Sequence, residues 1–159
     1  MSYEKVKEYF NSVGMGERVI VRENTIDTVE SAAKAVGCEP AHIAKTMSFI
    51  QKEEPVLIVT AGDAKVDNQK YKARFHEKAV MIPGDRAQAL VGHEPGAICP
   101  FGINEGVRVY LDISLKRFKQ VHTSAGSLNS TVTLSPTELE THSASVGWID
   151  VCKNWNNEG

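Results

Sequence analysis

The sequence predicts an α+β fold in which one mixed β-sheet is flanked by helices, within a single compact domain spanning residues 1–159. Three observations support this prediction. A chain of 159 residues, 42% of them hydrophobic, is long enough to bury one core. Short apolar, β-branched runs indicate strands, and segments with apolar residues at helical spacing alternate with them irregularly. We find no repeat, low-complexity tract or linker that would divide the chain.

The first two helices are indicated by apolar spacing and by residues suited to helix ends. Residues 4–13 carry apolar side chains at helical spacing, and Gly14 is suited to end that helix in a left-handed conformation. Asp27, followed three residues later by Glu30, has the pattern of a capping box. It predicts a second helix that stops at Gly37.

Two later helices and seven strands complete the predicted fold. Asp67 can cap the helix that follows it, and Ser135 with Glu138 has the pattern of a further helix start. The run 55–60 is short, apolar and β-branched, as expected for a central strand buried on both faces. The expected strands, in chain order, are residues 18–22, 45–50, 55–60, 107–111, 120–123, 131–134 and 148–152.

Charge and cysteine usage exclude several classes of function. A net charge of −2 and a pI near 6.2 argue against a protein that grips long nucleic acid by bulk electrostatics, but leave room for one recognised locally. No stretch approaches the roughly 20 apolar residues of a membrane span, so we expect a cytoplasmic protein. Cys38, Cys99 and Cys152 form no CxxC pair and the histidines show no HxH or HExxH spacing, so we expect neither disulfides nor a metal.

The segment 91–102 concentrates residues that restrict or free the backbone. Three glycines and two prolines lie within these twelve residues, between an expected helix and an expected strand. Glycine lets the backbone approach a ligand closely, and proline reduces the freedom of the loop. The segment is therefore either a preorganised, backbone-lined pocket or a structural turn.

Two other features are candidates for a binding site. Lys45 lies where a helical turn meets an apolar strand, so its ammonium can bind a phosphate or carbonyl oxygen, or extend to the surface. The turn Ser124-Ala-Gly-Ser127, between two expected strands, can bring backbone N–H groups and a hydroxyl to a ligand, or can be a tight turn only.

Taken together, these motifs resemble those of a known family. Ile43-Ala-Lys-Thr46 precedes an alternating strand, and is followed by Val59-Thr-Ala-Gly-Asp-Ala-Lys-Val66, by Gly92-x-x-x-Gly96-x-x-x-Pro-Phe-Gly102 and by Ser124-Ala-Gly126. Over about residues 28–150, their order and spacing resemble the YbaK-like aminoacyl-tRNA deacylases. These proteins are related to the editing insertion of bacterial prolyl-tRNA synthetases.

The resemblance implies a pocket between the strand of Lys45 and the glycine- and proline-rich loop, with no metal or organic cofactor. Lys45 is implied as the residue tied to activity, holding the aminoacyl ester or the terminal phosphate without acting as the nucleophile. Among the substrate-binding residues, His93 is a secondary candidate for proton transfer, although a surface histidine is the favoured interpretation. The implied substrate-binding residues are Thr46, Gly92, His93, Gly96, Ala97, Pro100, Gly102, Ser124 and Gly126.

The implied reaction is hydrolysis of mischarged tRNA by a free-standing editing enzyme. The sequence shows no G-x-S-x-G elbow and no Ser/His/Asp ordering, so a preorganised loop that positions water is the expected source of catalysis. The amino acid would be alanine, serine, threonine or cysteine, with prolyl tRNA as one candidate carrier. A synthetase partner and the oligomeric state are left open, and no membrane partner is expected.

Two other classes of protein compete with this reading. A non-catalytic module that binds tRNA or a synthetase would keep the same pocket. A thiol-dependent redox protein would use Cys99, but no resolving cysteine lies nearby in sequence, and a small buried residue is the favoured interpretation. The cationic residues of segment 65–78 are either a contact for the tRNA acceptor end or a solvated helix face.

The chain departs from the family pattern at two positions that concern substrate choice. Gly96-Ala97 replaces a frequent Gly-Gly pair, so we expect the methyl group of Ala97 to restrict the pocket to small side chains. Thr131 stands where some cysteine-editing relatives carry an acidic residue. Both departures weigh against cysteine as the substrate.

Overall fold

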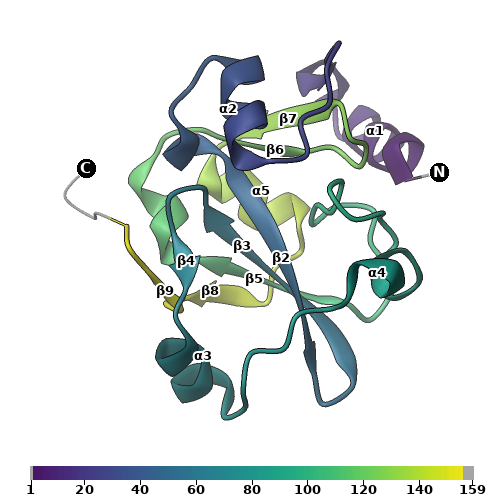
Figure 1. The fold of residues 1–159 in the computed structure, drawn as a ribbon. Helices are drawn as coiled ribbons and strands as arrows, with labels where there is room; N and C mark the ends of the chain where they lie inside the picture. Colours follow the sequence, from purple (N-terminus) through teal and green to yellow (C-terminus); the bar gives the residue numbers. More distant parts are fainter. Residues whose placement is uncertain (1, 156–159) are drawn as a thin grey trace.

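A mixed four-stranded sheet forms the centre of the fold (Figure 1). The computed structural model describes residues 2–155. In this sheet β2 pairs antiparallel with β3, whereas β3 with β5 and β5 with β8 pair parallel. The order is β2 (Ala44–Gln51), β3 (Glu54–Ala61), β5 (Arg108–Asp112) and β8 (Gly147–Ile149). The predicted α+β fold with a mixed sheet is confirmed.

Strand β3 is buried along most of its length. Residues 56–59 are completely inaccessible to solvent, because β2 and β5 cover both edges and the neighbouring elements cover both faces. Continuous apolar runs are typical of strands buried on both faces. The central position predicted from this run is confirmed.

Two smaller sheets accompany the central one. An antiparallel sheet has the order β1 (Val19–Val21), β7 (Ser130–Leu134) and β6 (Val121–Ser124). A two-stranded sheet joins β4 (Lys65–Val66) to β9 (Cys152–Lys153). The single strand predicted over residues 148–152 is wrong: after β8 the chain leaves the central sheet, where Val151 N donates to Asp112 Oδ1, and β9 pairs with β4 instead.

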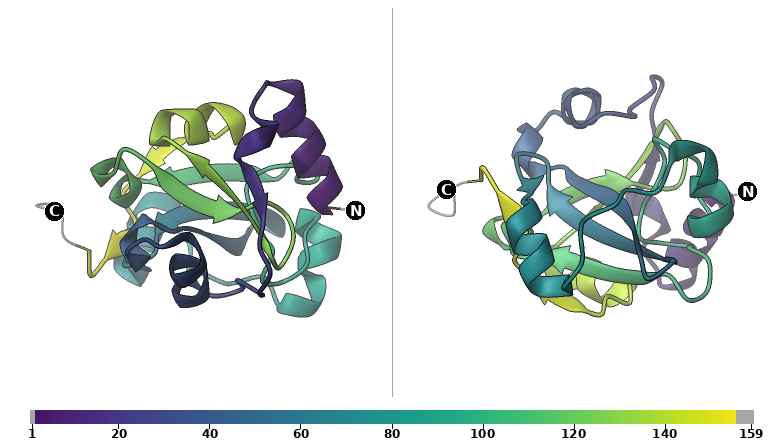
Figure 2. Two further views of the ribbon diagram at one scale, coloured as in Figure 1. Left: turned by 90° about the horizontal axis from the view of Figure 1, so that it is seen from above. Right: turned by 60° about the horizontal axis from the view of Figure 1, so that its bottom comes forward.

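The helices pack around these sheets. In Figure 1 the three-stranded sheet lies at the top with α1 and α2 beside it, α4 lies at the right and α3 at the bottom, and Figure 2 shows the termini on opposite sides of the molecule. The helices are α1 (Ser2–Ser12), α2 (Val29–Val36), α3 (Asn68–Phe75), α4 (Gly84–Val91) and α5 (Pro136–His142). Short 3₁₀ turns are η1 (Gly16–Arg18), η2 (Pro40–His42) and η3 (Ile113–Arg117).

Helix capping follows the sequence signals with one correction. Asp67 caps α3, and Ser135 with Glu138 forms a capping box at α5, as predicted. The capping box predicted for α2 at Asp27 is wrong by one residue, because Thr28 is the N-cap and its partner is Ser31. A threonine hydroxyl can accept the same backbone N–H as an aspartate, so Thr28 replaces Asp27 as the capping residue. The side chain of Asp27 is exposed.

The end of β3 touches the turn before β2 through a glycine. A Cβ atom added at Gly62 would lie 2.0 Å from the carbonyl oxygen of Pro40. No real Cβ atom approaches a backbone oxygen so closely, so only glycine allows this contact. The contact holds η2 against the end of β3 and thereby fixes where β2 begins.

We predict that Gly62→Ala lowers the free energy of unfolding by about 1–3 kcal/mol, because the added methyl group must displace the backbone of Pro40. Urea denaturation measures the change. Gly147→Ala is the matched control, since no described residue comes within 4 Å of a Cβ atom added there. Equal losses for the two variants would contradict the steric explanation.

Candidate functional site

A pocket of about 280 Å³ opens between the start of β2, the start of α2, the loop after α4 and the strands β6 and β7. Its wall therefore combines five separate segments of the chain. The lining residues are Ile26, Asp27, Thr28, Val29, Ala32, Ile43, Ala44, Lys45, Thr46, Met47, Gly96, Ile98, His122, Thr123, Ser124 and Thr131.

Lys45 is a half-buried cation in this wall. It lies opposite Thr60 in the register of β2 and β3. Within residues 2–155 no hydrogen bond or ion pair holds its ammonium group. Burial lowers the pKa of Lys45 from its usual value, and Lys65 lowers it further, whereas Cys152, Asp63 and Glu30 act in the opposite sense. A desolvated ammonium without a close partner is suited to bind an anionic or strongly polar ligand.

Two hydroxyl-bearing residues of the pocket are also unsatisfied. Thr46 Oγ1 and Thr123 Oγ1 are buried and have no hydrogen-bond partner in the described part of the chain. Most buried polar atoms in native proteins are paired, so each exception calls for an explanation. Both residues line the same cavity as Lys45, which indicates a place for a polar ligand.

Gly96 closes the pocket on the side of the loop. Its backbone has φ +87°, and a Cβ atom added there would lie 2.9 Å from Leu128 and 3.3 Å from Asp27. Ser124 ties the loop to the neighbouring turn, because its hydroxyl donates to the carbonyl oxygen of Ala97 at 3.3 Å. Glycine is required for both the conformation and the close approach.

Four of the predicted site residues therefore come together. Lys45, Thr46, Gly96 and Ser124 line one cavity, although they come from three separate segments of the chain. The other six predicted site residues lie outside its wall. They are Gly92, His93, Ala97, Pro100, Gly102 and Gly126.

The glycines outside the wall serve packing. A Cβ atom added at Gly126 would lie 3.0 Å from the carbonyl oxygen of Ser2, and one added at Gly102 would lie 3.4 Å from Val6, so both make room for α1. Gly92 ends α4 in the left-handed conformation. These three glycines are therefore explained by close backbone packing and by the end of a helix, and they do not contact the pocket.

The remaining residues outside the wall are buried. The prediction that His93 is a surface histidine is wrong: its side chain is fully buried, and its Nε2 lies 2.6 Å from the carbonyl oxygen of Phe101. The methyl group of Ala97 is fully buried too, so it does not narrow the pocket directly. Pro100 is also buried. Cys99 is buried as expected, and burial raises the pKa of its thiol to about 12.

Sequence reasoning missed the wall at the start of α2 and most of the wall that the three-stranded sheet forms. The start of α2 contributes Asp27 and Thr28, and the three-stranded sheet contributes His122 and Thr123. The capping signal marked the first of these segments as a helix start, but gave no sign that it faces β2. Alternation in 120–123 indicated a strand, and only the sheet pairing shows which strand it joins.

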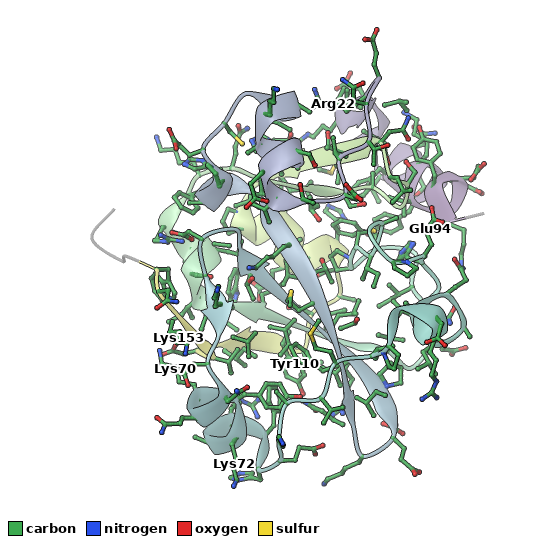
Figure 3. All side chains as sticks on the ribbon, in the orientation of Figure 1. Arg22, Lys70, Lys72, Glu94, Tyr110 and Lys153 are labelled. Carbon is green, nitrogen blue, oxygen red and sulfur yellow. The ribbon has the colours of Figure 1, made fainter. Side chains whose placement is uncertain are left out.

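The cationic residues of segment 65–78 have different partners in the structure. Lys70 bonds to Asp150 and to the carbonyl oxygen of Cys152, and the guanidinium of Arg74 lies over the rings of Phe75 and Tyr110. Arg22, which donates to pocket residue Thr131, lies at the opposite end of the view from Lys70 and Lys72 (Figure 3). The role of this segment in tRNA contact stays a prediction.

Two further observations concern metal binding and membrane spans in the described part of the chain. Among the residues that the structure describes, no group of three or more histidine, cysteine, aspartate or glutamate side chains is placed to hold a metal ion. The helices of residues 2–155 include none with the length and apolar character of a membrane span.

Comparison with known proteins identifies the family. The model of the aminoacyl-tRNA editing domain matches residues 23–141, which include every residue of the pocket wall. The chain belongs to the aminoacyl-tRNA editing domain family. This assignment confirms the resemblance inferred from the motifs.

Several members and neighbours of this editing-domain family resemble the chain. It is 43% identical over 156 residues to the uncharacterized protein YwhH of Bacillus subtilis, covering 98% of this chain and 99% of YwhH. It is 30% identical over 95 residues to proline–tRNA ligase of Limosilactobacillus fermentum, covering 56% of this chain and 17% of the ligase. A solved protein described as a candidate trans-editing enzyme for prolyl tRNA synthetase shares the fold, with a TM-score of 0.85, 23% identity and coverage of 96% of this chain and 97% of that one.

The buried histidine of the editing domain gives a prediction about pH. Burial lowers the pKa of His93 below its usual 6.5, so the unfolded chain takes up the proton at a higher pH than the folded one. The stability that the neutral ring contributes is therefore present above about pH 6.5 and is lost as the pH falls below it.

We expect the free energy of unfolding to fall more steeply between pH 7.5 and pH 5.5 in the wild type than in His93→Gln. The slopes should differ by up to about 1.4 kcal/mol per pH unit, the limit for one proton. Urea denaturation at several pH values measures both slopes. His122, whose pKa burial also lowers, is present in both proteins and cancels. Parallel curves would show that His93 does not titrate in this range.

Proposed function

We propose that this chain is an aminoacyl-tRNA deacylase that acts in trans, hydrolysing the ester between a small amino acid and the terminal ribose of a mischarged tRNA. One observation carries the proposal: within an editing domain, an unpaired Lys45 and the unsatisfied hydroxyls of Thr46 and Thr123 line a single small cavity. The expected place of action is the cytoplasm, where aminoacyl-tRNA is used.

The proposed chemistry relies on positioning. Water attacks the carbonyl carbon of the ester, the bond from that carbon to the ribose oxygen breaks, and the ribose hydroxyl leaves with a proton. Lys45 provides a fixed cation for the carbonyl oxygen or the neighbouring phosphate, as in electrostatic stabilisation of a developing oxyanion. The start of α2 and the Gly96 loop both line the cavity, so both can restrain the ester within it.

The residues of the pocket wall support a small amino acid as the group that is removed. Ile26, Val29, Ile98 and Met47 are bulky apolar side chains around a cavity of about 280 Å³. Alanine, serine and threonine fit this description best, and Thr131 stands where some cysteine-editing relatives carry an acidic residue. The similarity to a segment of proline–tRNA ligase supports the tRNA for proline as carrier, and such a synthetase as a candidate partner.

We expect Lys45→Ala to lower kcat/KM for deacylation about a hundredfold, on the order of 3 kcal/mol, because an orienting charge-assisted contact is lost. The urea midpoint should not fall, since this half-buried lysine has no partner among the described residues and contributes little to the core. Cys99→Ser is the control and should keep most of its activity. An active Lys45→Ala protein together with an inactive Cys99→Ser protein would refute the mechanism and favour thiol chemistry.

The pocket should also select by size. We expect alanyl tRNA to be hydrolysed with a far higher kcat/KM than phenylalanyl tRNA, by much more than the roughly tenfold that one methylene group gives. Ile98→Ala should narrow this difference by enlarging the wall. Equal specificity constants in the wild type would remove the argument from pocket size, and an unchanged ratio in Ile98→Ala would show that Ile98 does not set it.

A further inference from the structure

A second concavity adjoins the editing pocket on the three-stranded sheet. It is an open groove of about 1040 Å³ between η1, η2, the segment after η3, and strands β1, β6 and β7. His122 lines both the pocket and the groove, so the two adjoin at this residue. The groove plays no part in the hydrolysis proposed above.

Strand alternation explains why pocket and groove lie side by side. Residues two apart on a strand share a face. On β7, Thr131 lines the pocket and Thr133 lines the groove; on β6, Ser124 lines the pocket and His122 lies at the junction. His122 and Thr133 are cross-strand partners, and His122 Nδ1 lies 2.8 Å from Thr133 Oγ1. A ligand that extends out of the pocket along this face therefore enters the groove.

The groove combines stacked rings with positive charge. The rings of His42 and Phe118 are stacked at 4.1 Å with an interplanar angle of 29°, and neither residue is fully buried. The side chain of Ile20 is 41% exposed beside them. Lys119 is exposed, and among the described residues its ammonium group has no hydrogen-bond or ion-pair partner. Arg18 also lines the groove and remains 39% exposed in its ion pair with Glu138.

This chemistry matches single-stranded nucleic acid. Such sites combine flat side chains, on which bases stack, with cations that follow the phosphates. Of the three cationic side chains that line the groove, Arg18 is paired with Glu138 and Arg117 with Asp63, whereas Lys119 is exposed. Lys119 therefore supplies the cation for a phosphate, within a chain whose net charge is −2.

We propose that the groove binds the unpaired 3′ end of tRNA, namely the nucleotides that precede the terminal adenosine. A base stacks on the ring of His42, since Phe118 is already covered by His42 and by the guanidinium of Arg117, and Lys119 contacts a phosphate. The proposal rests on the proposed function only in taking the aminoacyl end to occupy the adjoining pocket. The path of the RNA follows from the residue that the two cavities share: the RNA passes from the pocket across His122 into the groove.

The first test measures binding without catalysis. The probe is the RNA tetranucleotide ACCA with fluorescein at its 5′ end, titrated with the full chain and followed by anisotropy. We expect Lys119→Glu and His42→Ala each to weaken binding at least fivefold. Lys52→Glu, a charge reversal in the turn between β2 and β3 at the far end of β2 from Lys45, is the matched control and should bind as the wild type does.

Other results of this titration would overturn the proposal. Binding that is lost in Lys72→Glu but kept in Lys119→Glu would place the RNA on segment 65–78. If the protein did not bind ACCA, the proposal that the groove binds RNA would be wrong. An acidic protein surface would then be the next partner to test. Because Phe118 packs against the core, it is left intact, and urea denaturation of each variant confirms that a loss of binding is not a loss of folding.

The second test separates this inference from the proposed function. The substrates are alanyl tRNA and the alanyl ester of adenosine, which lacks the preceding nucleotides. We expect Lys119→Glu to lower kcat/KM at least tenfold more for the tRNA than for the ester. Equal effects on both substrates would overturn the groove proposal while the deacylase proposal stands. Failure of the wild type to hydrolyse either would reject the deacylase proposal, with groove binding still decided by ACCA.

Discussion

The antiparallel pairing of β2 with β3 is the constraint on which the site depends. It runs from Ala44 opposite Ala61 to Gln51 opposite Glu54, and β3 is held on its other edge by β5. The close contact of Gly62 with Pro40 completes this pairing at the end where the pocket opens. A one-residue change in register would move every side chain of β2 to the opposite face. Lys45 could then no longer line the pocket.

A buried polar network joins the central strands at the same end of the sheet. Asp112, fully buried at the end of β5, accepts hydrogen bonds from the backbone N–H groups of Ser114 and Val151. The hydroxyl of Ser114 accepts in turn from the N–H of Ala61 in β3. These bonds join β3, β5 and the segment after β8 with every partner satisfied, which favours one arrangement over alternatives. The pocket therefore opens at the end of the sheet that this network holds together.

The sequence allowed prediction of elements whose signals are local. The apolar run of β3, the caps Asp67 and Ser135, and the place of Lys45 at the start of a strand all follow from spacing and residue type. A capping serine or aspartate acts on N–H groups two or three residues away, so its effect can be read without knowledge of the rest of the chain.

Features that depend on distant contacts could not be predicted in this way. Gly96 borders the pocket and Gly126 makes room for α1, yet both have positive φ and both lie in glycine-rich turns. Only the neighbouring element distinguishes a glycine that admits a ligand from one that admits a helix. The burial of His93 likewise depends on Phe101, which packs against Phe10 of α1.

The energetics of the empty pocket connect these observations to binding. A lysine removed from water without an ion pair, together with hydroxyls of Thr46 and Thr123 that have no partner in residues 2–155, is unfavourable for folding. The rigid pairing of β2 with β3 keeps these groups in place despite that cost. Because they are held in position before the ligand arrives, a polar ester gains their hydrogen bonds without the cost of rearranging the protein. A ligand lacking such groups leaves them unsatisfied, so the same arrangement that destabilises the empty domain gives the pocket its selectivity.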